Sequence, residues 1–191
     1  IRAFARVAGQ LESVELAVLG DGPLRPELEA LTRTLGLAGR VVFHGQVAPG
    51  RVRAELQRSH IFVQHNIQDS KGAVEGFGVA PAEAAACGLP VVAARSGGIV
   101  DQVEHGMTGF LVTEKDVDAM SAYMLQLARD AELRRRLGRA GRERMVRQFD
   151  CGGQVEKLEA VLLEVSGASG PEASVNTLSG QGRSLVCEET P

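Results

Sequence analysis

The sequence has little net charge and no long apolar run, and each absence removes a class of function. It contains 21 Lys and Arg against 24 Asp and Glu, for a formal net charge of −3. No overall field of the chain would therefore attract nucleic acid or an anionic membrane. No apolar stretch approaches the roughly 20 residues that a membrane-spanning helix needs. The composition, 44% hydrophobic and 24% charged, is that of an ordinary soluble globular domain.

Cysteine is also scarce. Cys87, Cys151 and Cys187 are odd in number and widely spaced, which fits neither a disulfide framework nor a zinc site. We therefore expect a reducing, cytoplasmic location. No acidic motif of the kind that holds a divalent metal to a diphosphate is visible, so no metal and no cofactor are predicted. The opening "IRAFARVAGQ" lacks a starting Met and is no signal peptide. It is typical of the middle of a helix and favours a piece cut from a longer protein.

Strand and helix patterns alternate along the rest of the chain. Short apolar runs predict strands at 14–20, 40–45, 60–65, 89–94 and 110–112. Helical patterns lie between them, and one of these places four leucines on a single face: Leu24, Leu28, Leu31 and Leu35. Such alternation predicts an α/β, Rossmann-like domain, a parallel sheet flanked by helices, with further helices at its C-terminal end. From about Ser166 the sequence is rich in Gly, Ser and Pro, so we predict a domain over 1–165 and a disordered tail over 166–191.

The stretch "AVEGFGVAPAEAAACGLPVVAA", residues 73–94, carries two glutamates eight positions apart. Glu83 stands among small apolar residues, and burying an unpaired carboxylate is costly, so it needs a partner. Pro81 fits only the first turn of a helix, which is therefore expected to begin near Phe77 or Gly78. The free N–H groups at that helix start would attract a phosphate.

Two hypotheses explain the pair of glutamates. Eight positions of helix span at most about 12 Å, which is roughly the separation between the two hydroxyl-rich ends of a nucleoside diphosphate sugar. A diphosphate at the helix start would then leave Glu75 facing a sugar and Glu83 facing a ribose. Gly76 and Gly78 would leave room for the ligand. Alternatively, Glu83 pairs with an arginine inside the fold.

The string "EGFGVAPAEAAACGLPVVAARSGGIVDQVEHGMTGFLV" resembles the retaining glycosyltransferases of family 4, the glycosyl transferases group 1. The resemblance continues upstream through "LAVLGDGPLRPELEAL" and "VVFHGQV", and downstream through "DAELRRRLGRAGRERMVRQF", over about residues 1–163. That family has a GT-B fold, in which two Rossmann-like domains face each other across the active site. This chain resembles only the C-terminal, donor-binding domain.

The resemblance implies a role for each matching residue. Glu75 would contact the donor sugar as the catalytic-site carboxylate, and Glu83 would bind the ribose. Backbone amides of Phe77, Gly78 and Val79 would approach the diphosphate. The remaining matches are Gly20 and Gly22 on the nucleotide side, Gly45 and Gln46 near the base, and Gly97 and Gly98 in a second loop at the cleft.

The partners implied are a nucleoside diphosphate sugar and an N-terminal acceptor domain, which this chain does not contain. The family's Arg and Lys that stabilise the leaving diphosphate precede the part matched here. We therefore expect the chain to be inactive by itself. Two alternatives stay open: half of a nucleotide-sugar 2-epimerase, and a non-catalytic nucleotide-sugar-binding module.

Other candidate motifs carry less weight. "GDGPLR" is a poor dinucleotide fingerprint because its third glycine position falls on Arg25. The four histidines, His44, His60, His65 and His105, show no metal-ligand spacing, and Lys71 is expected to be a solvated loop residue. The basic run that begins at Arg134 lacks interleaved aromatics and is broken by glutamates, so it predicts a solvated helix face rather than a nucleic-acid site. A peripheral contact with an anionic membrane in an intact enzyme is the residual expectation.

Overall fold

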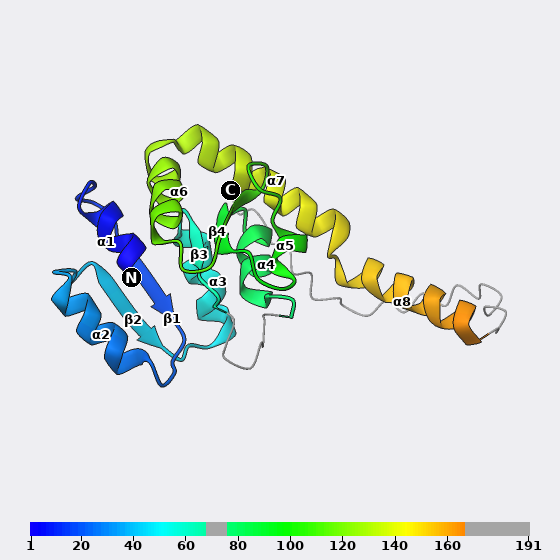
Figure 1. The fold of residues 1–191 in the computed structure, drawn as a ribbon. Helices are drawn as coiled ribbons and strands as arrows, with labels where there is room; N and C mark the ends of the chain where they lie inside the picture. Colours follow the sequence, from blue (N-terminus) through cyan, green and yellow to red (C-terminus); the bar gives the residue numbers. More distant parts are fainter. Residues whose placement is uncertain (68–75, 167–191) are drawn as a thin grey trace.

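The computed structural model describes residues 1–67 and 76–166. Strands and helices alternate as the sequence predicts, which confirms an α/β, Rossmann-like fold (Figure 1). The first part of the order is α1 (Arg2–Ala8), β1 (Leu16–Leu19), α2 (Arg25–Thr34), β2 (Val41–Gly45), α3 (Pro49–Arg58) and β3 (Phe62–Gln64). It continues with α4 (Val79–Ala86), β4 (Val91–Ala94), α5 (Ile99–Gln102), β5 (Gly109–Val112), α6 (Val117–Arg129), α7 (Ala131–Gln148) and α8 (Cys151–Ser166).

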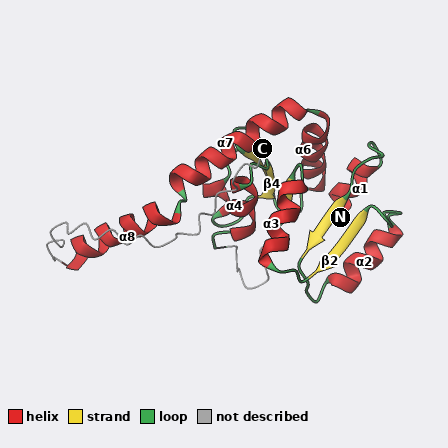
Figure 2. Cartoon of the chain, turned by 180° about the vertical axis from the view of Figure 1, so that it is seen from behind, coloured by secondary structure: helices red, strands yellow, loops and turns green. Residues whose placement is uncertain are grey.

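The strands are parallel, and their hydrogen bonds divide them between two sheets. Strand β1 pairs with β2, as Figures 1 and 2 show. Strand β4 lies between β3 and β5. Within the described residues, every strand except β4 therefore keeps one unpaired edge. Each parallel pair is joined through a helix, as parallel pairing requires.

Burial follows this arrangement. All four residues of β4, Val91–Ala94, have no exposed surface, as expected of an apolar strand with neighbours on both edges and helices on both faces. Strand β1 is just as apolar, "LAVL", but is only half-buried. Strand β5 is buried throughout although, among the described strands, it pairs with β4 alone, so neither composition nor position in the sheet decides burial by itself.

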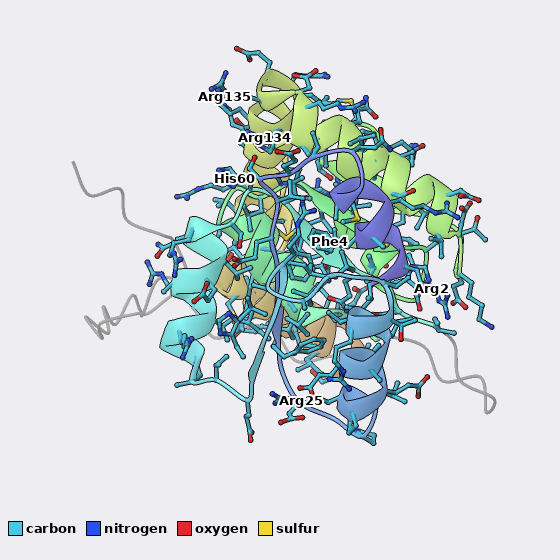
Figure 3. All side chains as sticks on the ribbon, turned by 90° about the vertical axis from the view of Figure 1, so that its left-hand side faces the viewer. Arg2, Phe4, Arg25, His60, Arg134 and Arg135 are labelled. Carbon is cyan, nitrogen blue, oxygen red and sulfur yellow. The ribbon has the colours of Figure 1, made fainter. Side chains whose placement is uncertain are left out.

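The residues of β4 alternate between two hydrophobic clusters. Val92 contributes to a cluster with Phe4 of α1 and Leu127 of α6, and Phe4, labelled in Figure 3, is only 3% exposed. Val91 and Ala93 contribute to the other cluster, which includes residues of α4, α5 and α7. Helix α1 packs on α6, and α4 packs on α7. Alternation along one strand thus gives the sheet two faces, each covered by helices.

Helix α7 approaches the end of α4 closely at one glycine. A Cβ atom built on Gly138 would overlap the carbonyl oxygen of Gly88. At Gly141, one turn further along α7, the nearest atom to such a Cβ is the Thr108 carbonyl oxygen at 3.4 Å. Gly138 therefore fixes how near α7 can lie to the turn that precedes β4, whereas Gly141 has more room.

Two helices are less covered than their sequences suggest. The predicted leucine face of α2 is not buried: Leu24 is 61% exposed, and Thr32 is the one buried residue of that helix. Helix α8 runs away from the body of the molecule and has no buried residue (Figure 1). Its exposed apolar residues are Val155, Leu158, Val161, Leu162 and Val165. The tail predicted from residue 166 lies outside the described residues apart from Ser166. No helix in the described ranges has the length and apolarity needed to cross a membrane.

Candidate functional site

The site develops around the start of α4. Gly78 is the N-cap of this helix, with φ 80 and ψ 78, a left-handed conformation that suits glycine. The helix begins at Val79, one or two residues later than expected, and Pro81 lies in its first turn as predicted. No side chain of residues 1–67 or 76–166 caps the helix start, while Phe77 is 46% and Val79 is 63% exposed. The first-turn N–H groups and the positive end of the helix dipole are thus open to an anion.

A second glycine loop lies against the segment that leads into α4. The Gly98 amide donates a hydrogen bond to the Gly76 carbonyl oxygen at 3.1 Å. A Cβ on Gly98 would overlap that oxygen and lie 3.0 Å from the Cα of Phe77, so no larger residue fits. Of the residues assigned from the sequence, the structure therefore brings together the loop before α4 and the Gly97–Gly98 loop.

Gln102, at the end of α5, belongs to the same cluster and was not predicted. Its side-chain amide donates hydrogen bonds to the carbonyl oxygens of Phe77 and Gly78, the latter at 3.1 Å. Gln102 is only 2% exposed, and its Oε1 atom has no hydrogen-bond partner in the described part of the chain. A lone glutamine in a short helix gives no motif. The one sequence feature that could have indicated Gln102 is that it is a polar residue among the apolar residues of "IVDQV".

Glu83 is exposed, so the expectation that it is buried is wrong. The buried face of α4 is formed by Pro81, Ala84 and Ala85, and at 100° per residue Glu83 lies opposite them, one turn from Val79. The alanines around Glu83 suggested burial, but whether a helical residue is buried depends on the side of the helix on which it lies. Across residues 1–67 and 76–166, the Glu83 side chain makes no hydrogen bond or ion pair. The alternative hypothesis of an internal arginine partner therefore finds no support. Glu75 and Lys71 lie outside the described residues.

The other predicted residues gather at the carboxyl ends of β1 and β2. The Gly20 amide donates to the Gly45 carbonyl oxygen at 2.8 Å. The guanidinium of Arg25, which Figure 3 labels, lies over Gly45 and is held by Glu29 at 2.8 Å and Asp21 at 3.0 Å. These two carboxylates raise the pKa of Arg25. Gly22 and Gln46 are exposed beside them. No hydrogen bond in the described ranges joins this group to the loops around α4.

The histidines take structural roles rather than a metal site. His65 accepts a hydrogen bond from the Lys115 amide at 2.8 Å, and burial lowers the pKa of His65. His105 accepts from the Leu111 amide at 3.1 Å, and His44 lies 3.0 Å from the Arg51 guanidinium. No three His, Cys, Asp or Glu residues of the described segments lie together as metal ligands would.

Most arginines of α7 lie on its outer face, but Arg134 and Arg144 are half-buried. Arg134 donates to the Leu127 carbonyl oxygen at 2.7 Å, and Arg144 donates to the Asp101 carbonyl oxygen at 2.8 Å. Arg135 pairs with Glu132 at 3.2 Å, and Arg147 pairs with Glu143 at 3.8 Å. Shallow hollows along this helix are lined by such arginine and glutamate side chains, and none of the loop residues around α4 lines them. This mixed, exposed face is as expected of a solvated helix surface.

Comparison with known proteins assigns the chain to a family. Residues 1–144 match the sequence profile of the glycosyl transferases group 1. The chain belongs to this family. It is 30% identical over 165 residues to the N-acetyl-alpha-D-glucosaminyl L-malate synthase of Bacillus anthracis, covering 86% of this chain and 41% of that one. This group 1 glycosyl transferase chain thus spans about two-fifths of that relative.

Solved structures agree with the assignment. Anabaena Alr3699/HepE in complex with UDP-glucose is 26% identical, with a TM-score of 0.73, covering 85% of this chain and 44% of that one. The C-terminal domain of the group 1 glycosyl transferase LpcC from Francisella tularensis has the same fold, with a TM-score of 0.69 at 21% identity. That likeness covers 78% of this chain and 77% of the LpcC domain. The fold is therefore that of the C-terminal half of a GT-B glycosyltransferase.

Proposed function

We propose that this chain is the donor-binding half of a retaining glycosyltransferase and that it holds a nucleoside diphosphate sugar with the diphosphate at the start of α4. The observation that carries this proposal is the exposed, uncapped first turn of α4. Gly98 and Gln102 hold the preceding loop in place from behind. The relative HepE, which shares the fold at 26% identity, was solved with UDP-glucose.

In this proposal each part of the donor meets a different group. The backbone amides of Phe77, Gly78 and Val79 bind the diphosphate, assisted by the helix dipole. Glu83 lies on the same exposed face of α4, about 6 Å along the axis from Val79, where its carboxylate accepts hydrogen bonds from the ribose hydroxyls. Glu75, which precedes the described part of this loop, contacts the sugar.

The base lies toward the carboxyl ends of β1 and β2, beside Gly20, Gly22, Gly45 and Gln46, with Gly97 and Gly98 lining the other loop. A hexose then passes, without a metal, to a glycan, lipid or small-molecule acceptor held by a second domain. This chain alone binds the donor weakly and does not transfer the sugar, because the acceptor side and the cationic pair that stabilise the leaving group come from elsewhere. A cytoplasmic location and a peripheral membrane contact stay predictions.

A titration of the ¹⁵N-labelled chain with a panel of nucleotides tests this proposal. Uridine, guanosine and adenosine diphosphate sugars would be compared by the backbone amide shifts of residues 76–79 and 97–98. We expect one base to shift these amides at the lowest concentration, and each nucleoside diphosphate to act more strongly than its nucleoside. Amide shifts confined to other surfaces, or none with any member of the panel, would refute the donor site.

A further inference from the structure

The Gln102 side chain lies beneath the loop that leads into α4. Its Nε2 atom donates to two consecutive carbonyl oxygens, those of Phe77 and Gly78. Because each peptide unit is planar and trans, its N–H points opposite to its C=O. Fixing the Phe77 carbonyl therefore fixes the Gly78 amide, and fixing the Gly78 carbonyl fixes the Val79 amide. One buried side chain thus sets the direction of two neighbouring N–H donors.

We infer that Gln102 is a positioning residue that aims the Gly78 and Val79 amides at the donor diphosphate. This inference rests on the proposed function, since those two amides are its proposed diphosphate donors. Gly78 is left-handed and without a Cβ, so its own backbone restrains it little. The hydrogen bond from the Gly98 amide fixes the Gly76 carbonyl, one peptide group earlier. Gln102 binds the carbonyls of the next two peptide groups.

The buried Oε1 atom of Gln102, which has no hydrogen-bond partner in the described residues, argues that Gln102 does more than fill space. Such an atom is destabilising. An unbranched apolar side chain of similar length would fill the same space without that cost. The amide therefore contributes through its N–H groups, by orienting the loop.

The test compares Gln102→Met with the parent chain, using UDP and uridine as probes in ¹⁵N shift titrations. Met keeps the length of the side chain and removes both the donors and the unsatisfied oxygen, so relief at Oε1 offsets in part the donor lost by the two carbonyl oxygens, and the variant should still fold. We expect UDP to bind about three- to tenfold more weakly, the range for one lost hydrogen bond, while uridine binds as before. Gln126→Met, at an exposed position of α6, is the matched control and should leave both affinities unchanged.

A second variant adds a readout that a purely structural role would not move. In Gln102→Glu, burial and the two facing carbonyl oxygens favour the protonated carboxyl, which keeps one donor, whereas the ionised form has none. The UDP affinity of this variant relative to the parent should therefore be higher at about pH 5.5 than at about pH 9. An equal ratio of the two affinities at both pH values would overturn the inference.

The outcomes separate the two proposals. If UDP shifts no amide of residues 76–79 in the parent, the proposed function fails. If the parent responds but Gln102→Met binds UDP equally well, or loses UDP and uridine alike, only the positioning role fails. Should Gln102→Met not fold, the parent still provides a test: the Gln102 side-chain NH₂ signals should shift with UDP and not with uridine, and their failure to do so overturns the role.

Discussion

Gly98 and Gly76 meet backbone to backbone, with the Gly98 amide donating to the Gly76 carbonyl oxygen at 3.1 Å. This hydrogen bond joins the loop after β4 to the loop before α4, two segments that are more than twenty positions apart in sequence. The contact requires glycine, since any Cβ on Gly98 would overlap the same oxygen. The segment that leads into α4 is therefore anchored to the loop after β4 by main-chain atoms alone at this point.

Replacing Gly98 by alanine should therefore be costly. Gly98→Ala forces the two loops apart, and overpacking of this kind lowers the free energy of unfolding by about 1–3 kcal/mol. The amide shifts of residues 76–79 should move as well. Gly50→Ala is the control, because Gly50 lies in α3 with open space around it and should be neutral or slightly stabilising. Equal urea midpoints for the parent and Gly98→Ala would contradict the geometry.

The two glycines of α7 provide a matched pair within one helix. Gly138→Ala would drive a methyl group into the Gly88 carbonyl oxygen and should destabilise the chain by about 1–3 kcal/mol. Gly141→Ala meets its nearest neighbour at 3.4 Å and gains helix propensity of up to about 1 kcal/mol. Thermal unfolding of both variants checks this order, and a Gly141 variant less stable than the Gly138 variant would refute it.

Glu83 should matter for the donor and not for stability. Its side chain is exposed and unpaired within the described ranges, so Glu83→Ala should unfold at the parent's temperature. Loss of hydrogen bonds from ribose hydroxyls to a carboxylate should weaken binding of the preferred nucleotide roughly tenfold or more. Glu159→Ala, an exposed glutamate of α8, is the control. Unaltered nucleotide affinity in Glu83→Ala would remove the ribose assignment.

His65 makes stability depend on pH. Its pKa is lowered from 6.5 in the folded state, because burial disfavours the charged ring. Neutral His65 accepts the Lys115 amide, and protonation removes that acceptor. The stabilisation is therefore complete above pH 6.5 and is lost as the pH falls through the lowered pKa.

A His65→Gln variant tests this dependence, because it keeps an acceptor that does not titrate. Between about pH 7 and pH 5, the parent should lose unfolding free energy relative to this variant. His60→Gln, at an exposed position, should follow the parent throughout. A constant difference between the parent and His65→Gln over this range would show that the ring does not titrate as stated.

The exposed leucines of α8 should contribute little to folding. Leu158 and Leu162 are 59% and 60% exposed, so Leu158→Ser and Leu162→Ser should change the free energy of unfolding by no more than about 0.5 kcal/mol. Leu127 of α6 has no exposed surface, and Leu127→Ala should cost about 2–5 kcal/mol. Denaturant unfolding of the three variants measures these differences. A large loss of unfolding free energy in Leu158→Ser would contradict the structure, in which no residue of α8 is buried.

Local patterns in the sequence predicted the elements well. The run "VVAA" predicts a buried strand because unbroken apolarity suits a strand covered on both faces, and β4 is that strand. Pro81 located the first turn of α4 to within two residues, because proline is tolerated there and not further in. Such features depend on a few neighbouring residues, so they can be predicted from the sequence without knowledge of the fold.

Features that depend on distant segments were not predictable in the same way. The burial of Glu83 was misjudged, and the exposure of Leu24 was not foreseen, because composition does not say which direction a helix face points or whether another element covers it. The role of Gln102 depends on carbonyl groups 24 and 25 positions earlier in the chain. The roles assigned to Glu75, Glu83 and the glycines came from family resemblance and stay predictions.

The division of the strands between two sheets sets an order of amide protection against solvent deuterium. Amides of β4 have partner strands on both sides and lie under helices, so only opening of the whole core releases them. Strand β1 pairs on one side and is half-buried, so a smaller fluctuation exposes its amides. The chain should therefore exchange in two stages, with the β1–β2 lobe first and the strands that support the α4 loop last, so the proposed base-binding side would open while the proposed diphosphate-binding loop stays intact.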